Sequence, residues 1–127
     1  MNLLDTDICI DLLRKNETAL DCYATLPERP GIPGFVALEL VLGCRDSDEL
    51  RRVRAFIRKF TVVWPPEKDL DRAVTDYAPL RLAHGIGGMD ALIAATVVGR
   101  GGTLFSLNLR HFRAIPDLKV VSLTNYS

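Results

Sequence analysis

Three carboxylates occupy positions in this sequence at which an acidic side chain needs an explanation. Asp5 and Asp90 each stand at the start of a predicted helix, where a carboxylate ordinarily caps the first turn. Glu39 differs, because its helical neighbours three and four residues away are apolar or small: Phe35, Val36, Leu42 and Gly43. A carboxylate on such a face must reach water, a partner or a metal ion. Each residue alone permits a structural role, and the three together favour a chemical one.

Carboxylates that a fold brings close together repel one another, and some stay protonated unless a cation neutralises the group. Oxygen ligands without cysteine or paired histidine suit Mg²⁺ or Mn²⁺, which bridge carboxylates to phosphate. Such a metal activates water for attack on a phosphodiester and offsets the charge of the transition state. If Asp5, Glu39 and Asp90 meet, the sequence therefore predicts metal-dependent cleavage of a phosphodiester bond.

Two apolar strand candidates would bring polar residues to a common edge. Asp5 directly follows the apolar run at 2–4, and Asn108 directly follows the strand expected over 103–107. In an open parallel sheet, functional groups gather at the carboxyl ends of the strands. We therefore expect Asp5 and Asn108 at one rim of the sheet.

The rest of the sequence alternates between strand and helix patterns. Further strands are expected at 61–64 and 119–123, with at most a very short strand in the loop 27–34. Helices are expected over 8–15, 16–26, 36–44, 46–59, 67–82 with a bend before Pro79, and 89–98, and a flexible loop over 84–88. The charges of 46–59 fit a solvated helix face. This alternation predicts an α/β fold with a parallel sheet and helices on both faces, in a single domain spanning 1–127.

Composition limits the possible classes of protein. Sixteen basic and sixteen acidic residues give zero net charge, so any RNA contact must be local. The three cysteines lack the spacing of a zinc site and are odd in number, which indicates reduced thiols and a cytoplasmic protein. No signal peptide and no membrane-spanning run is recognised, so we expect no membrane association.

Four short motifs follow one another along the chain: Leu3–Asp7, Ala37–Gly43, Met89–Thr96 and Leu104–Phe112. In order, spacing and surrounding apolar pattern they resemble the motifs of PIN-domain proteins, especially VapC-type toxins. The resemblance covers nearly the whole chain. It implies a three-layer α/β/α fold with a short, mostly parallel central sheet, and Mg²⁺- or Mn²⁺-dependent endonuclease activity on RNA. It also implies a cognate antitoxin that occupies a groove and blocks the site, and a homodimer.

The resemblance assigns roles to individual residues. The family's first three acidic positions fall on Asp5, Glu39 and Asp90, which would hold the metal. Asn108 stands where many relatives have a fourth acid, and its amide oxygen supplies a ligand atom but no charge. Asp7, often Asn in relatives, either restores part of that charge or caps a helix.

Four further residues are weaker candidates. Thr6 and Ser106 would hydrogen-bond the metal ligands, although hydroxyls beside strand ends are also common in ordinary turns. Arg110 and Arg113 would contact RNA phosphates, or are solvated surface charges.

Three other interpretations stay open. Asp5 and Asp7 after an apolar strand also resemble the nucleophile motif of haloacid-dehalogenase-like phosphatases, but no lysine lies near Asp90 and the chain is short for that family. His84 and His111 each have a nearby arginine, which permits a metal-independent ribonuclease. The high apolar content also fits a non-catalytic domain that binds a protein partner.

Overall fold

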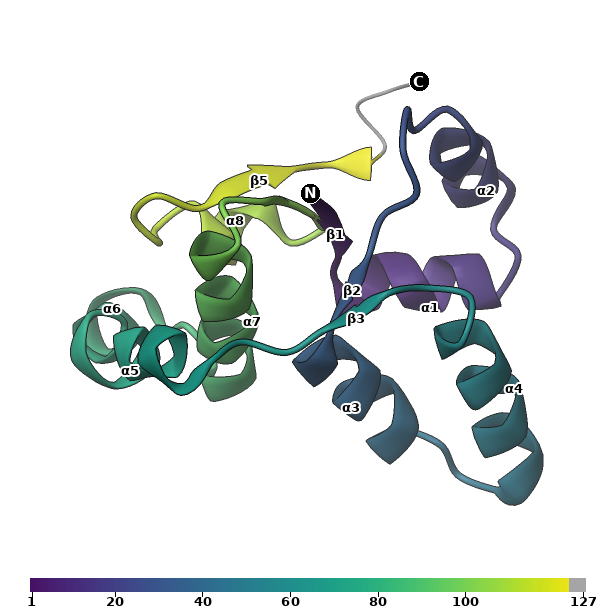
Figure 1. The fold of residues 1–127 in the computed structure, drawn as a ribbon, viewed down its shortest axis with the longest axis horizontal. Helices are drawn as coiled ribbons and strands as arrows, with labels where there is room; N and C mark the ends of the chain where they lie inside the picture. Colours follow the sequence, from purple (N-terminus) through teal and green to yellow (C-terminus); the bar gives the residue numbers. More distant parts are fainter. Residues whose placement is uncertain (124–127) are drawn as a thin grey trace.

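The structure, a computed structural model, describes residues 1–123 and contains a parallel sheet of short strands (Figure 1). The strands are β1 (Asn2–Leu4), β2 (Ile32–Pro33), β3 (Val62–Val63), β4 (Thr103–Phe105) and β5 (Lys119–Val121). β1 pairs with β4 and β4 with β5, while β2 pairs with β3. A parallel bridge between Leu3 and Gly31 joins the two parts, so the order across the molecule is β3-β2-β1-β4-β5. Every pairing is parallel, as the alternating pattern predicts.

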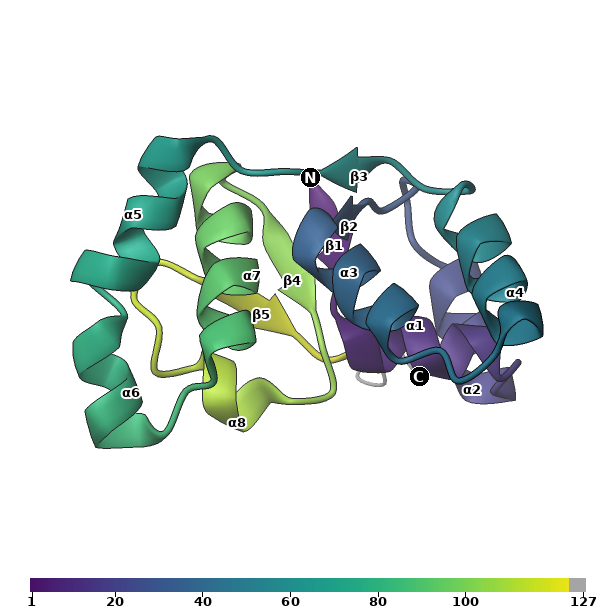
Figure 2. The ribbon, with the colours of Figure 1, turned by 90° about the horizontal axis from the view of Figure 1, so that it is seen from below.

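Helices cover this sheet on both sides. Figure 2 shows α3 (Gly34–Leu42) and α7 (Gly88–Gly99) next to each other in front of the strands, and Figure 1 shows α2 (Glu17–Ala24) on the opposite side. The other helices are α1 (Thr6–Leu13), α4 (Ser47–Ile57), α5 (Glu67–Thr75), α6 (Ala78–His84) and α8 (Leu109–Phe112). None of these described helices is long and apolar enough to cross a membrane. The α/β class and the three layers are confirmed.

The core forms where α3 and α7 pack on the sheet. Leu3, Leu4 and Leu104 are fully buried in the central strands, because the helices cover that part of the parallel sheet on both faces. α7 contributes small and branched side chains, including Ile93 and Ala94. The packing brings the first turns of the helices that follow β1, β2 and β4 to the carboxyl edge of the sheet.

Several boundaries differ from those the sequence predicts. The stretch 67–82 is two helices, since α5 ends at Thr75 and α6 begins at Ala78, just before Pro79. α6 continues to His84, which the sequence places in a loop, because Gly85 ends it in a left-handed conformation with φ of 69°. β4 ends at Phe105, two residues earlier than expected, so Asn108 is separated from it by Ser106 and Leu107.

Candidate active site

Asp5 lies at the junction of β1 and α1, buried with 6% of its surface exposed. Its Oδ1 accepts a hydrogen bond of 2.8 Å from the backbone N–H of Thr6, so Asp5 does cap α1. Its Oδ2 accepts a bond of 2.7 Å from the hydroxyl of Ser106. Both the capping role and contact with the neighbouring strand end are therefore real, and they hold one buried carboxylate in a fixed orientation.

Asp7 joins the start of α1 to the chain that follows β4. Its Oδ1 accepts the backbone N–H of Ile8 at 2.7 Å, and its Oδ2 accepts the backbone N–H of Leu107 at 3.0 Å. The hydroxyl of Ser106 also lies 3.4 Å from Asp7 Oδ2. Both oxygens of Asp7 are thus used in fastening the two loops together.

Glu39 projects from α3 toward the first turn of α1. The hydroxyl of Thr6 donates a hydrogen bond of 2.6 Å to Glu39 Oε1. Thr6 therefore contacts Glu39 through its side chain and Asp5 through its backbone. The apolar face around Glu39 is explained by this placement, because the carboxylate leaves the core at the helix edge and meets a hydroxyl from another element.

Asp90 does not cap α7, contrary to its N-cap-like sequence context. The N-cap is Gly87, without a side-chain capping bond, and Asp90 is the third residue of the helix. The Asp90 carboxylate accepts no capping hydrogen bond from the backbone N–H groups of this turn. The basic side chain beside it is His111, whose Nδ1 lies 3.9 Å from Asp90 Oδ2. The Asp90 side chain is 28% exposed, so it faces the same edge from a partly open position.

Asn108 is the N-cap residue of α8 without a side-chain capping bond. Its backbone N–H donates to Ser106 Oγ at 2.9 Å, and its side-chain nitrogen lies 3.1 Å from His111 Nδ1. His111 therefore stands between Asn108 and Asp90. Sequence analysis considered His111 only for a metal-independent ribonuclease, because one turn of helix between two loops carries no periodic signal that would place it beside Asp90.

Electrostatics single out Asp5 within this group. Burial is the main cause that raises its pKa to about 7, and the charges of Asp7 and Asp90 raise it further, while the bonds from Ser106 and Thr6 lower it. Burial also raises the pKa of Asp90, against the lowering effect of His111. Within residues 1–123, no lysine or arginine forms an ion pair with these three aspartates. The basic side chain beside Asp90 is His111, which carries a charge only when it is protonated.

Such a group fits a divalent metal ion in its chemistry. The oxygens of Asp5, Asp90 and Glu39 are hard donors, and a cation would offset the burial that is the main cause of the raised pKa of Asp5, as well as the repulsion from Asp7 and Asp90. In the described part of the chain, no three acidic, histidine or cysteine side chains lie close enough together to hold a metal ion by themselves. Asp5 and Asp90 are close enough to interact, and Glu39 is linked to Asp5 through Thr6. Mg²⁺ retains several waters in proteins and does not require a closed shell of side chains.

The two arginines proposed beside the site, Arg110 and Arg113, are exposed in and after α8, and neither side chain is bonded to another described residue. Both interpretations of these residues stay open. Three other arginines, Arg14, Arg45 and Arg52, line a cavity that begins at Glu39. The sequence did not identify them, because Arg52 belongs to a helix whose charges fit a solvated face and Arg14 lies at the end of another helix.

Comparisons with known proteins agree with this fold. Residues 3–118 match the family model of the PIN domain. Ribonuclease VapC19 of Mycobacterium tuberculosis is 37% identical over 125 residues, which cover 94% of this chain and 98% of that protein. A DNA-bound VapBC crystal structure from Salmonella typhimurium has a TM-score of 0.81 at 26% identity, covering 96% of this chain and 97% of that one. A toxin-antitoxin complex from Klebsiella pneumoniae has a TM-score of 0.77 at 25% identity, covering 97% and 98%. Since the family model and the relative both span nearly the whole chain, the chain belongs to the PIN domain family.

Proposed function

We propose that this chain is a Mg²⁺- or Mn²⁺-dependent endoribonuclease and the toxin of a toxin–antitoxin pair. One observation carries the proposal: the buried carboxyl of Asp5 interacts with Asp7 and Asp90, and within residues 1–123 no lysine or arginine forms an ion pair with any of the three, although His111 lies beside Asp90. Such a group of carboxylates is better suited to binding a cation than to catalysis by an acid and a base without a metal. The 37% identity to a protein named as a ribonuclease supports RNA as the substrate.

Asp5, Glu39 and Asp90 would hold the metal in this proposal, and Asn108 would orient a ligand without adding charge. When bound, the metal supplies an activated water for attack on the phosphodiester and offsets charge in the transition state. The protein contributes the positions of the carboxylates. Ser106 fixes Asp5 and Thr6 fixes Glu39, each through one hydroxyl.

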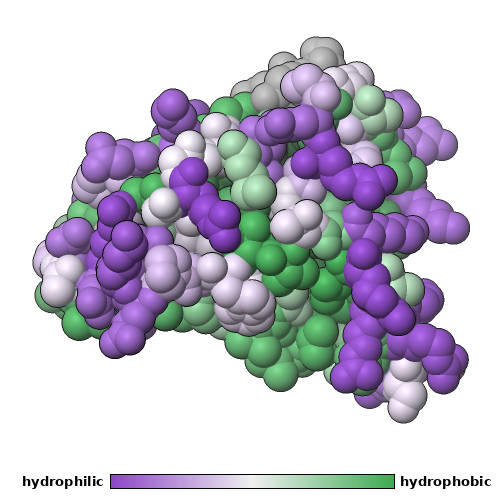
Figure 3. Space-filling view, viewed as in Figure 1, coloured by the Kyte–Doolittle hydropathy of each residue, from purple (hydrophilic) through white to green (hydrophobic). Residues whose placement is uncertain are grey.

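Partner proteins form the second part of the proposal. The similar solved structures include toxin-antitoxin and VapBC complexes, which supports a cognate antitoxin. We propose in addition that the chain forms a homodimer. Figure 3 shows apolar side chains gathered over the lower middle of the molecule, where α3 lies in Figure 1. Leu42 and Trp64 are 72% and 55% exposed there. We expect a dimer in light scattering of the purified chain, and a weaker dimer in Leu42→Glu.

We also place the protein, as a single PIN domain, in the cytoplasm. Cys9, Cys22 and Cys44 are free thiols, of which the first two are buried. Free cysteines are typical of proteins in a reducing compartment.

The structure gives the phosphatase alternative less support. That chemistry needs Asp7 as a mobile acid and base, but both its oxygens accept backbone N–H bonds. The histidine-dependent ribonuclease and the non-catalytic binding domain are distinguished from the proposal by the RNA cleavage experiment that follows.

The test is cleavage of a mixed cellular RNA pool by the purified chain, free of any partner, with Mg²⁺, Mn²⁺ or EDTA. We expect metal-dependent cutting that is abolished in Asp5→Asn, Glu39→Gln and Asp90→Asn, because each removes ligand charge. Asp71→Asn, an exposed position on α5, is the matched control and should cut normally. Cutting that persists in EDTA would indicate histidine chemistry. Full activity in all three variants would contradict the assignment of the site, and no cutting under any condition would favour the binding domain.

A further inference from the structure

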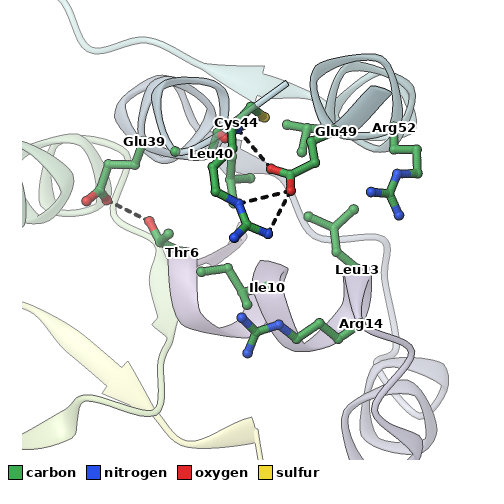
Figure 4. A pocket seen from close by; sticks show the side chains of 12 residues that line it. Thr6, Ile10, Leu13, Arg14, Glu39, Leu40, Cys44, Glu49 and Arg52 are labelled. Carbon is green, nitrogen blue, oxygen red and sulfur yellow. Dashed lines mark hydrogen bonds and ion pairs between the residues drawn. The ribbon is translucent and has the colours of Figure 1, made fainter. Parts of the chain in front are cut away.

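A cavity of about 460 Å³ lies between α1, α3 and α4, directly beside the proposed site (Figure 4). Thr6 and Glu39, joined by their hydrogen bond, line one end of it. Ile10, Leu40 and Val53 line its apolar part. If the bond that is cut lies at Glu39, the part of the substrate next to that bond would therefore enter this cavity.

Three arginines line the same cavity: Arg14 at the end of α1, Arg45 in the loop between α3 and α4, and Arg52 in α4 (Figure 4). Arg45 is neutralised by Glu49, with which it forms a salt bridge of 3.0 Å and a second hydrogen bond of 3.2 Å. The guanidinium groups of Arg14 and Arg52 have no ion pair or hydrogen bond with any residue of 1–123. Both side chains are exposed. The guanidinium groups of Arg14 and Arg52 are therefore available to an anionic ligand.

We propose that this cavity receives one nucleotide of the RNA next to the bond that is cut, with Arg14 and Arg52 contacting its phosphates. The inference rests on the proposed ribonuclease function. Guanidinium groups match phosphate geometry and are the usual choice for such contacts. Cavities of 300–1,000 Å³ hold small organic groups. An unstacked base would pack on the apolar part, which is how proteins often bind single-stranded RNA.

Charge distribution favours RNA over an acidic protein segment as the occupant. The chain has no net charge, so binding of a polyanion requires local cations that are not already paired. Arg14 and Arg52 meet that need, since both line the cavity; Figure 4 shows them away from the end at which Thr6 and Glu39 lie. The pairing of Glu49 with Arg45 limits the repulsion that a free carboxylate would exert on a phosphate.

The experiment measures binding of a fluorescein-labelled single-stranded RNA of random sequence in EDTA, where metal-dependent cutting is absent. We expect Arg14→Ala and Arg52→Ala each to weaken binding by about tenfold, as for a lost charge-assisted bond. Each should also reduce the slope of log affinity against log salt by about 0.7. Arg54→Ala is the matched control, because Arg54 is an exposed arginine of the same helix that lines a different cavity. Thermal unfolding checks that the variants are folded.

RNA affinity and salt slope equal to those of Arg54→Ala would overturn the proposal, even if the wild-type chain cuts RNA. Normal RNA binding combined with lost capture of a protein partner would also overturn it, because the cavity would then belong to that partner. Weakened RNA binding in both variants would support it. If RNA binding were weakened in both variants but the wild-type chain cut no RNA with Mg²⁺ or Mn²⁺, the ribonuclease proposal would fail. The proposed contact of Arg14 and Arg52 with RNA would still stand.

Discussion

The hydroxyl of Ser106 donates a hydrogen bond of 2.7 Å to Asp5 Oδ2, although the two residues lie 101 positions apart in the sequence. The parallel pairing of β1 with β4, in which Leu4 lies opposite Phe105, brings them together at neighbouring strand ends. This bond lowers the pKa of Asp5, whereas burial and the charges of Asp7 and Asp90 raise it to about 7. The ionised form of Asp5 is thus stabilised by the Ser106 hydroxyl, by the backbone N–H of Thr6 and by any cation that the site binds.

Loss of this hydroxyl should weaken the site without unfolding the protein. In Ser106→Ala, Asp5 loses the side-chain donor that stabilises its carboxylate, so we expect tighter proton binding and weaker metal binding. Removal of a residue that orients a metal ligand typically costs about 10–100-fold in metal affinity or activity. The measurement is the Mg²⁺ concentration that gives half-maximal RNA cleavage.

Ser47→Ala provides the matched control, because Ser47 is an exposed serine at the first position of α4. It should leave the Mg²⁺ requirement unchanged. An unchanged requirement in Ser106→Ala as well would show that the hydrogen bond does not contribute to the site.

The stability of the metal-free protein should fall as the pH rises from about 4 to about 7. A carboxyl whose pKa is higher in the folded than in the unfolded state binds its proton more tightly when folded, so protonation stabilises the fold. The pKa of Asp5 rises from 3.8 to about 7, and its contribution is therefore greatest below pH 4 and lost above pH 7. The loss is at most about 4 kcal/mol, since each tenfold change in proton affinity corresponds to about 1.4 kcal/mol. Urea unfolding in EDTA measures it.

Asp5→Asn separates this contribution from that of other groups. The variant cannot ionise at this position, so its free energy of unfolding should vary less between pH 4 and pH 8 than that of the wild type. Relative to the wild type it should be more stable at pH 8 than at pH 5. Equal pH dependence in the two proteins would show that Asp5 ionises normally.

Much of the fold was predictable because its signals are local. The apolar run before Asp5 and the small, apolar stretch of α7 identify a strand and a buried helix from residue type alone. The end of β4 was not predictable, because Ser106 leaves the strand to bond Asp5 while its backbone N–H still bonds Val121. Which residue ends a strand of three depends on such long-range bonds.

The candidate site was predictable to a smaller extent. Asp5 and Asp90 interact as expected, because strands and helices that share a sheet edge must bring their ends together. The capping bond expected for Asp90 is absent, because α7 begins at Gly88 rather than after Asp90. The contacts of His111 with Asp90 and Asn108, and the place of Arg52 at the cavity, were not predicted, because they depend on which neighbouring element faces each residue, and a single sequence does not contain that information.

Addition of Mn²⁺ or Mg²⁺ should raise the unfolding temperature at pH 8. A cation that binds only the folded state stabilises it, and the gain grows with the logarithm of the ratio of cation concentration to dissociation constant. Here the cation would also relieve the repulsion of Asp5 by Asp7 and Asp90. EDTA should reverse the shift. The shift should disappear in Asp90→Asn, which removes one proposed ligand, and persist in the control Asp71→Asn. A shift of equal size in Asp90→Asn would place the metal elsewhere.

Asn108→Ala should reduce RNA cleavage less than Asp90→Asn. The side chain of Asn108 carries no charge and its nitrogen lies 3.1 Å from His111, so alanine removes an orienting contact and leaves all three carboxylates in place. Asp90→Asn instead removes a charge next to Asp5. The comparison uses kcat/KM for one RNA at saturating Mg²⁺. A loss in Asn108→Ala as deep as that in Asp90→Asn would mean that the amide is itself required, and that the position of the family's fourth acid is functional without its charge.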